Sequence, residues 1–181
     1  MTTPRDEPFS HLAGGEARMV DVGGKRPTRR EAVAEAWVEV GPAIARRLHE
    51  RGGLAKGNVL ETARLAGIQA AKKTADLIPL CHNVPLDAVE MEARLEGDRV
   101  HLTARVRCHA RTGVEMEALT AVAVAALTVY DMVKSARDLP GGGRGVRIRE
   151  IRLLEKRGGR SGRWTAPPAD GEEPAGGQAS A

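Results

Sequence analysis

The sequence predicts an α+β fold in which an antiparallel sheet packs against helices, and three observations lead to it. Two neighbouring segments, 86–96 and 99–108, alternate apolar and polar residues with the period of a strand. Three other segments, 28–50, 58–74 and 112–136, begin with residue patterns that cap helices. The longest of these is apolar on most sides and can cover a sheet.

The chain has 181 residues and no internal repeat, which fits one domain around one core. We expect this domain over residues 11–164, between a flexible N-terminus at 1–10 and a disordered tail at 165–181. Aromatic residues make up only 2% of the chain, so few rings are available on which nucleic-acid bases could stack.

The formal charge of +4 points to an anionic partner. The N-terminus lacks the apolar core of a signal peptide, and no run looks long enough to span a bilayer. The two cysteines, without an export signal, are expected to be reduced thiols in the cytoplasm.

The first helix is expected over residues 28–50. Thr28 and Glu31 fit a capping box ahead of it. The apolar residues that follow recur at helical spacing and form one stripe: Val33, Trp37, Val40, Ile44 and Leu48. Gly41 and Pro42 should kink or split this helix, because proline lacks the backbone donor.

A second helix is expected from about Asn58, where Glu61 completes a capping pattern, towards Thr74. The segment that follows, "IPLCHNVPL" (78–86), contains two prolines. Proline fixes its own φ and pushes the preceding residue into extended geometry, so this connection should be stiff and extended.

The two alternating segments form a predicted hairpin. The inward residues of the first are Val89, Met91, Ala93 and Leu95, and those of the second are Val100, Leu102, Ala104, Val106 and Cys108. Gly97 and Asp98 suit a tight turn between them. In this pattern Cys108 is interpreted as a core residue.

The longest helix is expected to open with a capping box at Thr112 and Glu115 and to run to about Ala136. Its apolar composition indicates burial, partly against another subunit. A glycine-rich loop, "LPGGGRG", then leads to a last strand around residues 151–156.

Charged residues on the longest helix are the first candidates for chemistry. Asp131 and Lys134 are three residues apart and share a face. An ordinary surface ion pair is the plain interpretation. However, a lysine held by a carboxylate among apolar neighbours can also transfer protons. Glu117 falls only ~40° from Asp131 around the helix axis, while Glu115 is explained by its capping position.

Cys81 and His82 are fixed between the two prolines of the stiff connection. Adjacent residues of an extended segment point to opposite sides, which argues against a Cys–His nucleophile couple. We expect His82 to face a site and Cys81 to pack beneath it. Zinc is not expected, because no second Cys or His spacing completes a ligand set.

Two basic corners are rich in glycine. Lys156 ends a strand and opens into "RGGRSG", and Lys56 precedes Gly57 at the start of a helix. Glycines let backbone amides approach an oxyanion, so the two corners suit a polyphosphate. The plain alternative is a solvated charged surface.

Four blocks of the sequence resemble the cyclic pyranopterin monophosphate synthase family, the C protein of molybdenum cofactor biosynthesis. They are "MVDVGGK" (19–25), "KGNVLETARLAGIQAAKKTADLIPLCH" (56–82), "TGVEMEALTAVAVAALTVYDMVKS" (112–135) and "IRLLEKRGGRSG" (151–162). The resemblance covers roughly residues 10–163, and the LCH and GVEMEALT blocks are highly specific.

The resemblance implies a ferredoxin-like subunit in a homohexamer of three dimers. It implies that a 3′,8-cyclised dihydro-GTP is converted to the cyclic pyranopterin with release of pyrophosphate. Asp131 and Lys134 match the central acid–base pair. The other matching pocket residues are Lys56, Leu80, Cys81, His82, Glu115, Met116, Glu117 and Lys156. No redox cofactor or resident metal is implied, and a role for Mg²⁺ with the triphosphate stays open.

The sequence departs from the family pattern at Asn83, where many members have proline, and at Arg160, where lysine is common. Gly41–Pro42 in the first helix and the loop "RDLPGGGRG" are further departures. Arginine cannot give up a proton, so residue 160 could bind phosphate but not act as an acid, and whether it contacts the substrate stays open. Two other classes of function stay open. They are a basic nucleic-acid-binding module, favoured by the arginine-rich strand, and a hydrolase with Cys81 as nucleophile.

Overall fold

A computed structural model describes residues 12–13, 16–51, 58–136, 139 and 142–167. Its centre is a five-stranded antiparallel sheet in the order β4-β5-β3-β6-β7. The strands of this sheet are β3 (Thr28–Glu39), β4 (Ala88–Glu96), β5 (Arg99–Ala110), β6 (Arg147–Arg157) and β7 (Trp164–Thr165). A separate two-stranded pair, β1 (Leu12–Ala13) and β2 (Glu16–Ala17), precedes them.

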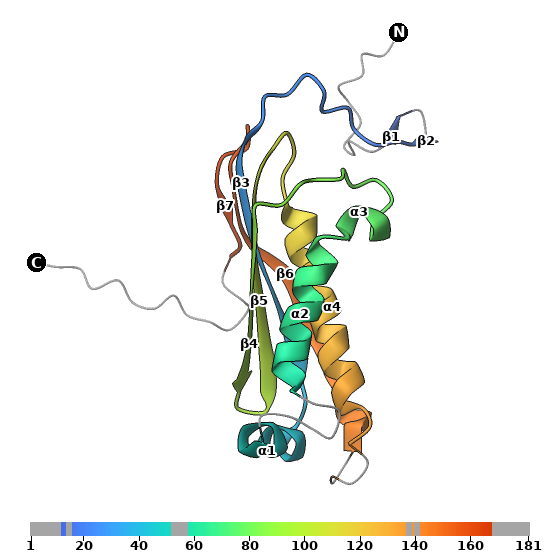
Figure 1. The fold of residues 1–181 in the computed structure, drawn as a ribbon, viewed down its shortest axis with the longest axis vertical. Helices are drawn as coiled ribbons and strands as arrows, with labels where there is room; N and C mark the ends of the chain where they lie inside the picture. The colour runs from blue at the N-terminus through green and yellow to red at the C-terminus, as the bar shows by residue number, and fades with distance from the viewer. Residues whose placement is uncertain (1–11, 14–15, 52–57, 137–138, 140–141, 168–181) are drawn as a thin grey trace, which may run out of the picture.

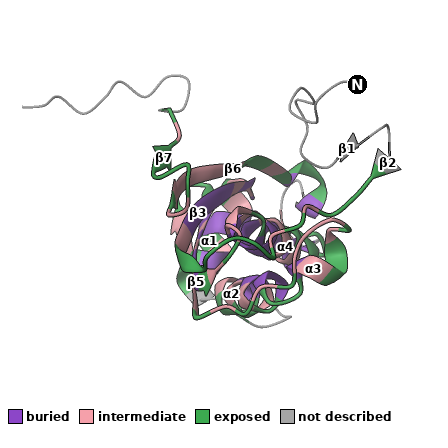
Figure 2. Cartoon of the chain, turned by 90° about the horizontal axis from the view of Figure 1, so that it is seen from above, coloured by how far each residue is buried: buried purple, intermediate pink, exposed green. Residues whose placement is uncertain are grey.

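The helices after residue 58 lie on one side of the sheet, and the helix before it lies at the lower end of the sheet (Figure 1). They are α1 (Pro42–Arg51), α2 (Val59–Ala71), α3 (Thr74–Leu77) and α4 (Glu115–Val133), with a 3₁₀ turn, η1, at Gly142–Gly145. The long helix α4 packs across β3, β5 and β6, and α2 packs beside it on β4. Figure 2 shows the buried residues concentrated between this helical layer and the sheet. The predicted α+β sandwich in one domain is confirmed.

Residues 28–39 form a strand, so the helix predicted there is wrong. Thr28 pairs with Ala110 of β5 and caps nothing. Every second side chain faces the helices, and four of these are fully buried: Ala32, Ala34, Ala36 and Val38. Val33 and Trp37, which the helical stripe included, lie on the opposite face of the strand. Pairing with β5 and β6 on both sides outweighs the helix propensity of the alanines.

The Gly41–Pro42 pair marks the boundary between β3 and α1. Gly41 has a φ of 78°, and Pro42 is the first residue of α1, where a missing N–H costs nothing. Only the second half of the predicted first helix is therefore helical, from residue 42.

The second predicted helix and the hairpin are confirmed. The Asn58 side chain accepts a hydrogen bond from the Glu61 N–H at 3.1 Å and caps α2. Strands β4 and β5 pair up to Glu96 and Arg99, so the intervening two residues form the turn. All five predicted inward residues of β5, Cys108 included, are 0% exposed.

Helix α4 begins later than predicted. Its N-cap residue is Val114, without a side-chain cap, so the capping box at Thr112 is wrong. Thr112 lies too far ahead of the first helical residue, Glu115, to reach the N–H groups of its first turn. By length and composition α4 could cross a membrane, contrary to expectation, but more than half of its most apolar window is buried inside the protein. It is the core helix of the sandwich.

Candidate active site

Glu117 is a buried carboxyl group in the first turn of α4. It is 5% exposed, and its negative charge acts on the thiols of Cys81 and Cys108. Burial raises its pKa to about 6; the N–H of its own backbone opposes this shift, and the negative charge of Glu115 adds to it. A carboxyl group with such a pKa can both hold and release a proton near neutral pH, which suits acid–base work.

Cys81 lies against this end of α4. Burial is the main cause that raises the pKa of its thiol, and the negative charge of Glu117 raises it further. The thiol is therefore kept protonated, whereas a nucleophilic cysteine needs a lowered pKa. The adjacent His82 directs its Nε2 to the Val20 carbonyl oxygen, to which it donates at 2.7 Å. These contacts disfavour Cys81 as the nucleophile of a hydrolase.

We expect Cys81→Ser to lower turnover by less than about fivefold, since the thiol packs and does not react. Steady-state kinetics of the folded variant measure this. A loss as deep as that of a missing general acid would make the thiol a participant in the reaction.

Lys156 lies beside the same end of α4, at the end of β6. Its Nζ donates to the Ser161 Oγ at 2.9 Å and lies 3.6 Å from the Glu115 Oε1. In the sheet it pairs with Ala32, whose side chain faces the helices. The end of β6, the start of α4 and the turn that contains Ser161 thus form one corner with carboxyl and ammonium groups. Met116, which follows Glu115 on α4, is 38% exposed.

Asp131 and Lys134 lie at the other end of α4. The Lys134 Nζ is 2.6 Å from the Asp131 Oδ1, and both side chains are more than half exposed. The hydrogen bond that Lys134 donates to Asp131, and then the negative charge of Asp131, raise the pKa of Lys134. The η1 turn packs on the backbone here, since a Cβ on Gly143 would lie 2.3 Å from the Lys134 Cα. This close approach explains one glycine of the loop and fixes the end of the helix.

The predicted site residues therefore fall into two groups within one chain. Cys81, Glu115, Glu117 and Lys156 meet at the start of α4, with Leu80 and His82 on the connection beside Cys81. Asp131 and Lys134 meet at its far end. Lys56 lies outside the described residues. Although Glu117 and Asp131 are close in angle around the axis, Glu117 is buried and Asp131 is exposed.

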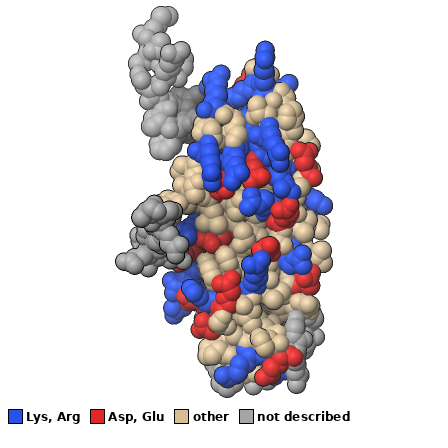
Figure 3. Space-filling model, turned by 90° about the vertical axis from the view of Figure 1, so that its left-hand side faces the viewer, with Lys and Arg blue, Asp and Glu red and all other residues tan. Residues whose placement is uncertain are grey.

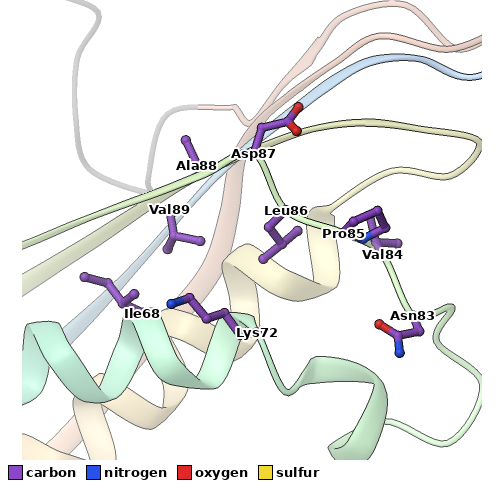
Figure 4. Close-up of a pocket in the computed structure, with 9 residues that line it drawn as sticks. All are labelled: Ile68, Lys72, Asn83, Val84, Pro85, Leu86, Asp87, Ala88 and Val89. Atoms are coloured by element: carbon purple, nitrogen blue, oxygen red, sulfur yellow. The ribbon is translucent and has the colours of Figure 1, made fainter.

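A separate cavity of about 560 Å³ lies between α2 and the connection that leads into β4 (Figure 4). It is lined by Ile68, Lys72, Asn83, Val84, Pro85, Leu86, Asp87, Ala88 and Val89. None of the predicted site residues lines it, although Asn83, one of the departures from the family pattern, does. Among the described residues, no group of three or more His, Cys, Asp and Glu side chains is placed to hold a metal ion.

The structure also places residues at the start of α4 that the sequence did not predict. Arg30 faces the helical layer from β3, in register with the buried Cys108, and its charge acts on the Cys108 thiol. Ser161 contacts Lys156, and the Val20 carbonyl orients His82. Strand periodicity could have identified Arg30, because it shares the inward face with Ala32.

The pKa of Glu117 gives a prediction for stability. Because its pKa rises from 4.5 to about 6 on folding, the neutral form is favoured in the folded protein. The resulting stabilisation is complete below pH 4.5 and is lost as the pH rises through 6. We expect Glu117→Gln to match wild type at pH 4.5 and to be more stable by about 2 kcal/mol at pH 8.

Urea unfolding of both proteins at equal concentration across this pH range measures the difference. Glu61→Gln, on the exposed surface of α2, is the control and should show no comparable rise with pH. A pH-independent difference for Glu117→Gln would mean that this carboxyl group is not protonated on folding.

Comparison with known proteins identifies the family of this chain. Residues 19–159 match the MoaC family. The chain is 55% identical over 154 residues to the cyclic pyranopterin monophosphate synthase of Rhodospirillum rubrum, which covers 84% of this chain and 89% of that protein. For the proteins of the same name from Methylobacterium sp. and Novosphingobium aromaticivorans the identities are 56% and 51%, covering 89% and 87% of this chain and 98% and 97% of theirs. The chain therefore belongs to the MoaC family.

Proposed function

We propose that this protein converts (8S)-3′,8-cyclo-7,8-dihydroguanosine 5′-triphosphate to cyclic pyranopterin monophosphate with release of pyrophosphate. As a family member the chain is an enzyme, a lyase of molybdenum cofactor biosynthesis. The identity of 51–56% to relatives of that name, over more than four fifths of the chain, carries the proposal. The residues of both groups at the ends of α4 supply the acids and bases that the rearrangement needs.

The reaction needs groups that transfer protons and a site that binds the phosphates. Glu117, with a pKa of about 6, and the Asp131–Lys134 pair can each give and take a proton. Lys156 offers its ammonium to the phosphates, as Lys56 would by the family pattern. A hydroxyl oxygen of the substrate attacks the first phosphorus, loses its proton to a base and expels pyrophosphate as the cyclic phosphate closes.

We place the complete site at a subunit interface. Within one chain its two groups lie at opposite ends of α4, too far apart for one small substrate. The outward surface of α4 carries an apolar stripe with a spacing of three and four residues: Met116, Leu119, Ala123, Leu127 and Tyr130. Three residues of this stripe, Met116, Leu127 and Tyr130, are exposed large apolar side chains, and a contiguous apolar stripe favours contact with a partner. A second copy of this chain, packed α4 against α4, would cover the stripe, and a homohexamer of three such dimers is proposed.

A cytoplasmic location is part of the proposal. Both cysteines are free thiols, and Cys108 is fully buried in the core. Their reduced state fits a compartment that keeps thiols reduced.

A nucleic-acid-binding role for the open face of the sheet has less support. The arginines on this face pair with glutamates: Arg105 with Glu31, Arg107 with Glu90, Arg149 with Glu39 and Arg152 with Glu35. Figure 3 shows basic and acidic groups interspersed over this side of the molecule. The Trp37 ring is stacked on His101 and covered by the Arg99 guanidinium, so it offers no free platform for a base.

Incubation of the purified protein with the cyclised dihydro-GTP tests the proposal. We expect pyrophosphate and a pterin chromophore to appear together, in equal amounts. Asp131→Asn protein at the same concentration is the control for contaminating activity. Folded protein that releases no pyrophosphate above this control would contradict the proposed function.

A further inference from the structure

The cavity between α2 and the connection into β4 lies outside both groups of candidate site residues. Its volume of about 560 Å³ falls within the range of about 300–1,000 Å³ that is usual for pockets that hold small molecules. Two segments far apart in the sequence form it: the end of α2, through Ile68 and Lys72, and residues 83–89. None of the residues that the proposed reaction uses lines it, so a ligand here would be distinct from the substrate.

The walls of the cavity are largely apolar. Ile68 on α2 and Leu86 and Val89 on the facing segment direct their side chains into the space between the two segments (Figure 4). All three pack against the core but are only partly buried, so apolar surface stays accessible here. Such walls favour a ligand with an apolar body, because its binding removes this surface from water.

One cation faces this apolar space. Lys72 extends its Nζ beside Ile68 and opposite Val89 (Figure 4). Within the described structure Lys72 forms no ion pair and no side-chain hydrogen bond. Asp87 is the one carboxylate among the lining residues, and Figure 4 shows it turned away from the cavity. An ammonium group beside an apolar wall favours a ligand that carries a negative charge next to its apolar body.

The number of charges on this ligand follows from the rest of the lining. Asn83 lies at the opposite end of the cavity from the Lys72 Nζ, and its carboxamide is neutral (Figure 4). A phosphate chain needs several cations, and this lining offers one. The cavity therefore suits a monoanion.

We propose that this cavity binds a small monocarboxylate with an apolar body and is an effector site. Lys72 holds the carboxylate, and the body of the ligand contacts Ile68, Leu86 and Val89. The proposal goes beyond the proposed function, since this ligand is neither substrate nor product of that reaction.

An occupant of the cavity lies against the connection that carries His82. This connection is held at two points: the His82 Nε2 donates to the Val20 carbonyl at 2.7 Å, and the Asp87 N–H donates to the Arg107 carbonyl at 2.9 Å. Between them, residues 83–86 donate no backbone hydrogen bond within the described structure. A ligand that presses on this stretch displaces it more easily than its anchored ends, and so it moves His82.

Octanoate, a monocarboxylate with an apolar chain, is the probe, and titration calorimetry with the full chain measures its binding. We expect a Kd below about 1 mM. Acetate has the same charge without the chain, and octylamine has the same chain with the opposite charge, so each should bind at least tenfold more weakly. Octylamine that binds as tightly as octanoate would overturn the proposal, as would wild type that does not bind octanoate, for instance because a neighbouring subunit fills the cavity.

Variants of the lining locate the binding. Lys72→Met should weaken octanoate binding by tenfold or more, and Lys72→Arg, which keeps the charge, should stay within threefold of wild type. Lys73→Met is the matched control: it removes the same charge from the next residue, which is exposed and does not line the cavity, and should stay within twofold. Val84→Phe keeps Lys72 but fills the space, so it should also weaken binding tenfold.

Circular dichroism identifies a variant that does not fold, and Lys72 is exposed, so Lys72→Met should fold as wild type does. Folded Lys72→Met that binds octanoate within threefold of wild type would overturn the proposal.

Steady-state kinetics with the cyclised dihydro-GTP test the effector role, and this test alone rests on the proposed function. Saturating octanoate should raise KM by threefold or more in wild type, because it displaces His82, and should leave the KM of Lys72→Met unchanged. An unchanged KM in wild type that binds octanoate would overturn the effector role. Wild type that binds octanoate through Lys72 but does not turn over the cyclised dihydro-GTP would instead contradict the proposed function alone.

Discussion

Asp131→Asn and Lys134→Ala are each expected to lower turnover by 10²–10⁴-fold, which is the usual contribution of a positioned acid or base. The Lys134 Nζ lies 2.6 Å from the Asp131 Oδ1, and this hydrogen bond raises the pKa of the lysine. Asparagine at 131 keeps the size of the side chain but removes the charge that holds the ammonium form. The lysine then loses the partner that orients it, and its pKa falls back towards its ordinary value.

A second ion pair in the same chain serves as the control. On α2, Glu61 and Arg64 are also three residues apart, 2.6 Å from each other and similarly exposed. If Asp131 and Lys134 were only a surface pair, Glu61→Gln and Asp131→Asn would both leave turnover unchanged. We expect Glu61→Gln within twofold of wild type in steady-state assays. Thermal unfolding should not distinguish the variants, since both pairs are on the surface. Asp131→Asn or Lys134→Ala activity within threefold of wild type would remove the pair from the mechanism.

The elements predicted correctly are those whose local pattern agrees with their tertiary contacts. The hairpin alternates cleanly because one face of β4 and β5 packs against helices, and its two-residue turn contains a glycine. Helix α2 begins at a residue whose side chain caps it. In β3 the local pattern and the tertiary contacts conflict, because alanine at three successive inward positions, 32, 34 and 36, also favours a helix. Small side chains are needed at these positions because α4 packs on β3 there, and this packing is visible only in the tertiary structure.

The candidate site follows from the sequence only in part, for the same reason. Family motifs identify Glu117, Lys156 and the Asp131–Lys134 pair, but a motif does not state which side chains are buried. The buried state of Glu117 depends on the rotation of α4 over the sheet, and this sets its pKa. Arg30 was missed because its inward orientation exists only if residue 30 belongs to a strand. An error in one element thus concealed one residue of the candidate site.

The two groups of candidate site residues lie at opposite ends of α4, and this separation predicts a second large effect on activity. Glu117 and Asp131 are 14 residues apart, which is ~21 Å along the helix axis at 1.5 Å per residue. One compact substrate cannot contact both from the same chain. In an antiparallel α4–α4 crossing about a two-fold axis, Glu117 of one chain approaches Asp131 of the other. Each dimer then contains two equivalent sites, and each site needs both chains.

Mixing two inactive variants, Glu117→Gln and Asp131→Asn, should therefore restore activity once their subunits exchange. In a hybrid dimer one shared site carries both substitutions and the other carries neither. With equal amounts and random pairing about half of the dimers are hybrid, and one of their two sites works, so roughly a quarter of wild-type activity should return. Native mass spectrometry confirms the exchange, and either variant treated alone is the control. A site built within one chain would always carry one substitution, so confirmed exchange without recovered activity would rule out the shared site.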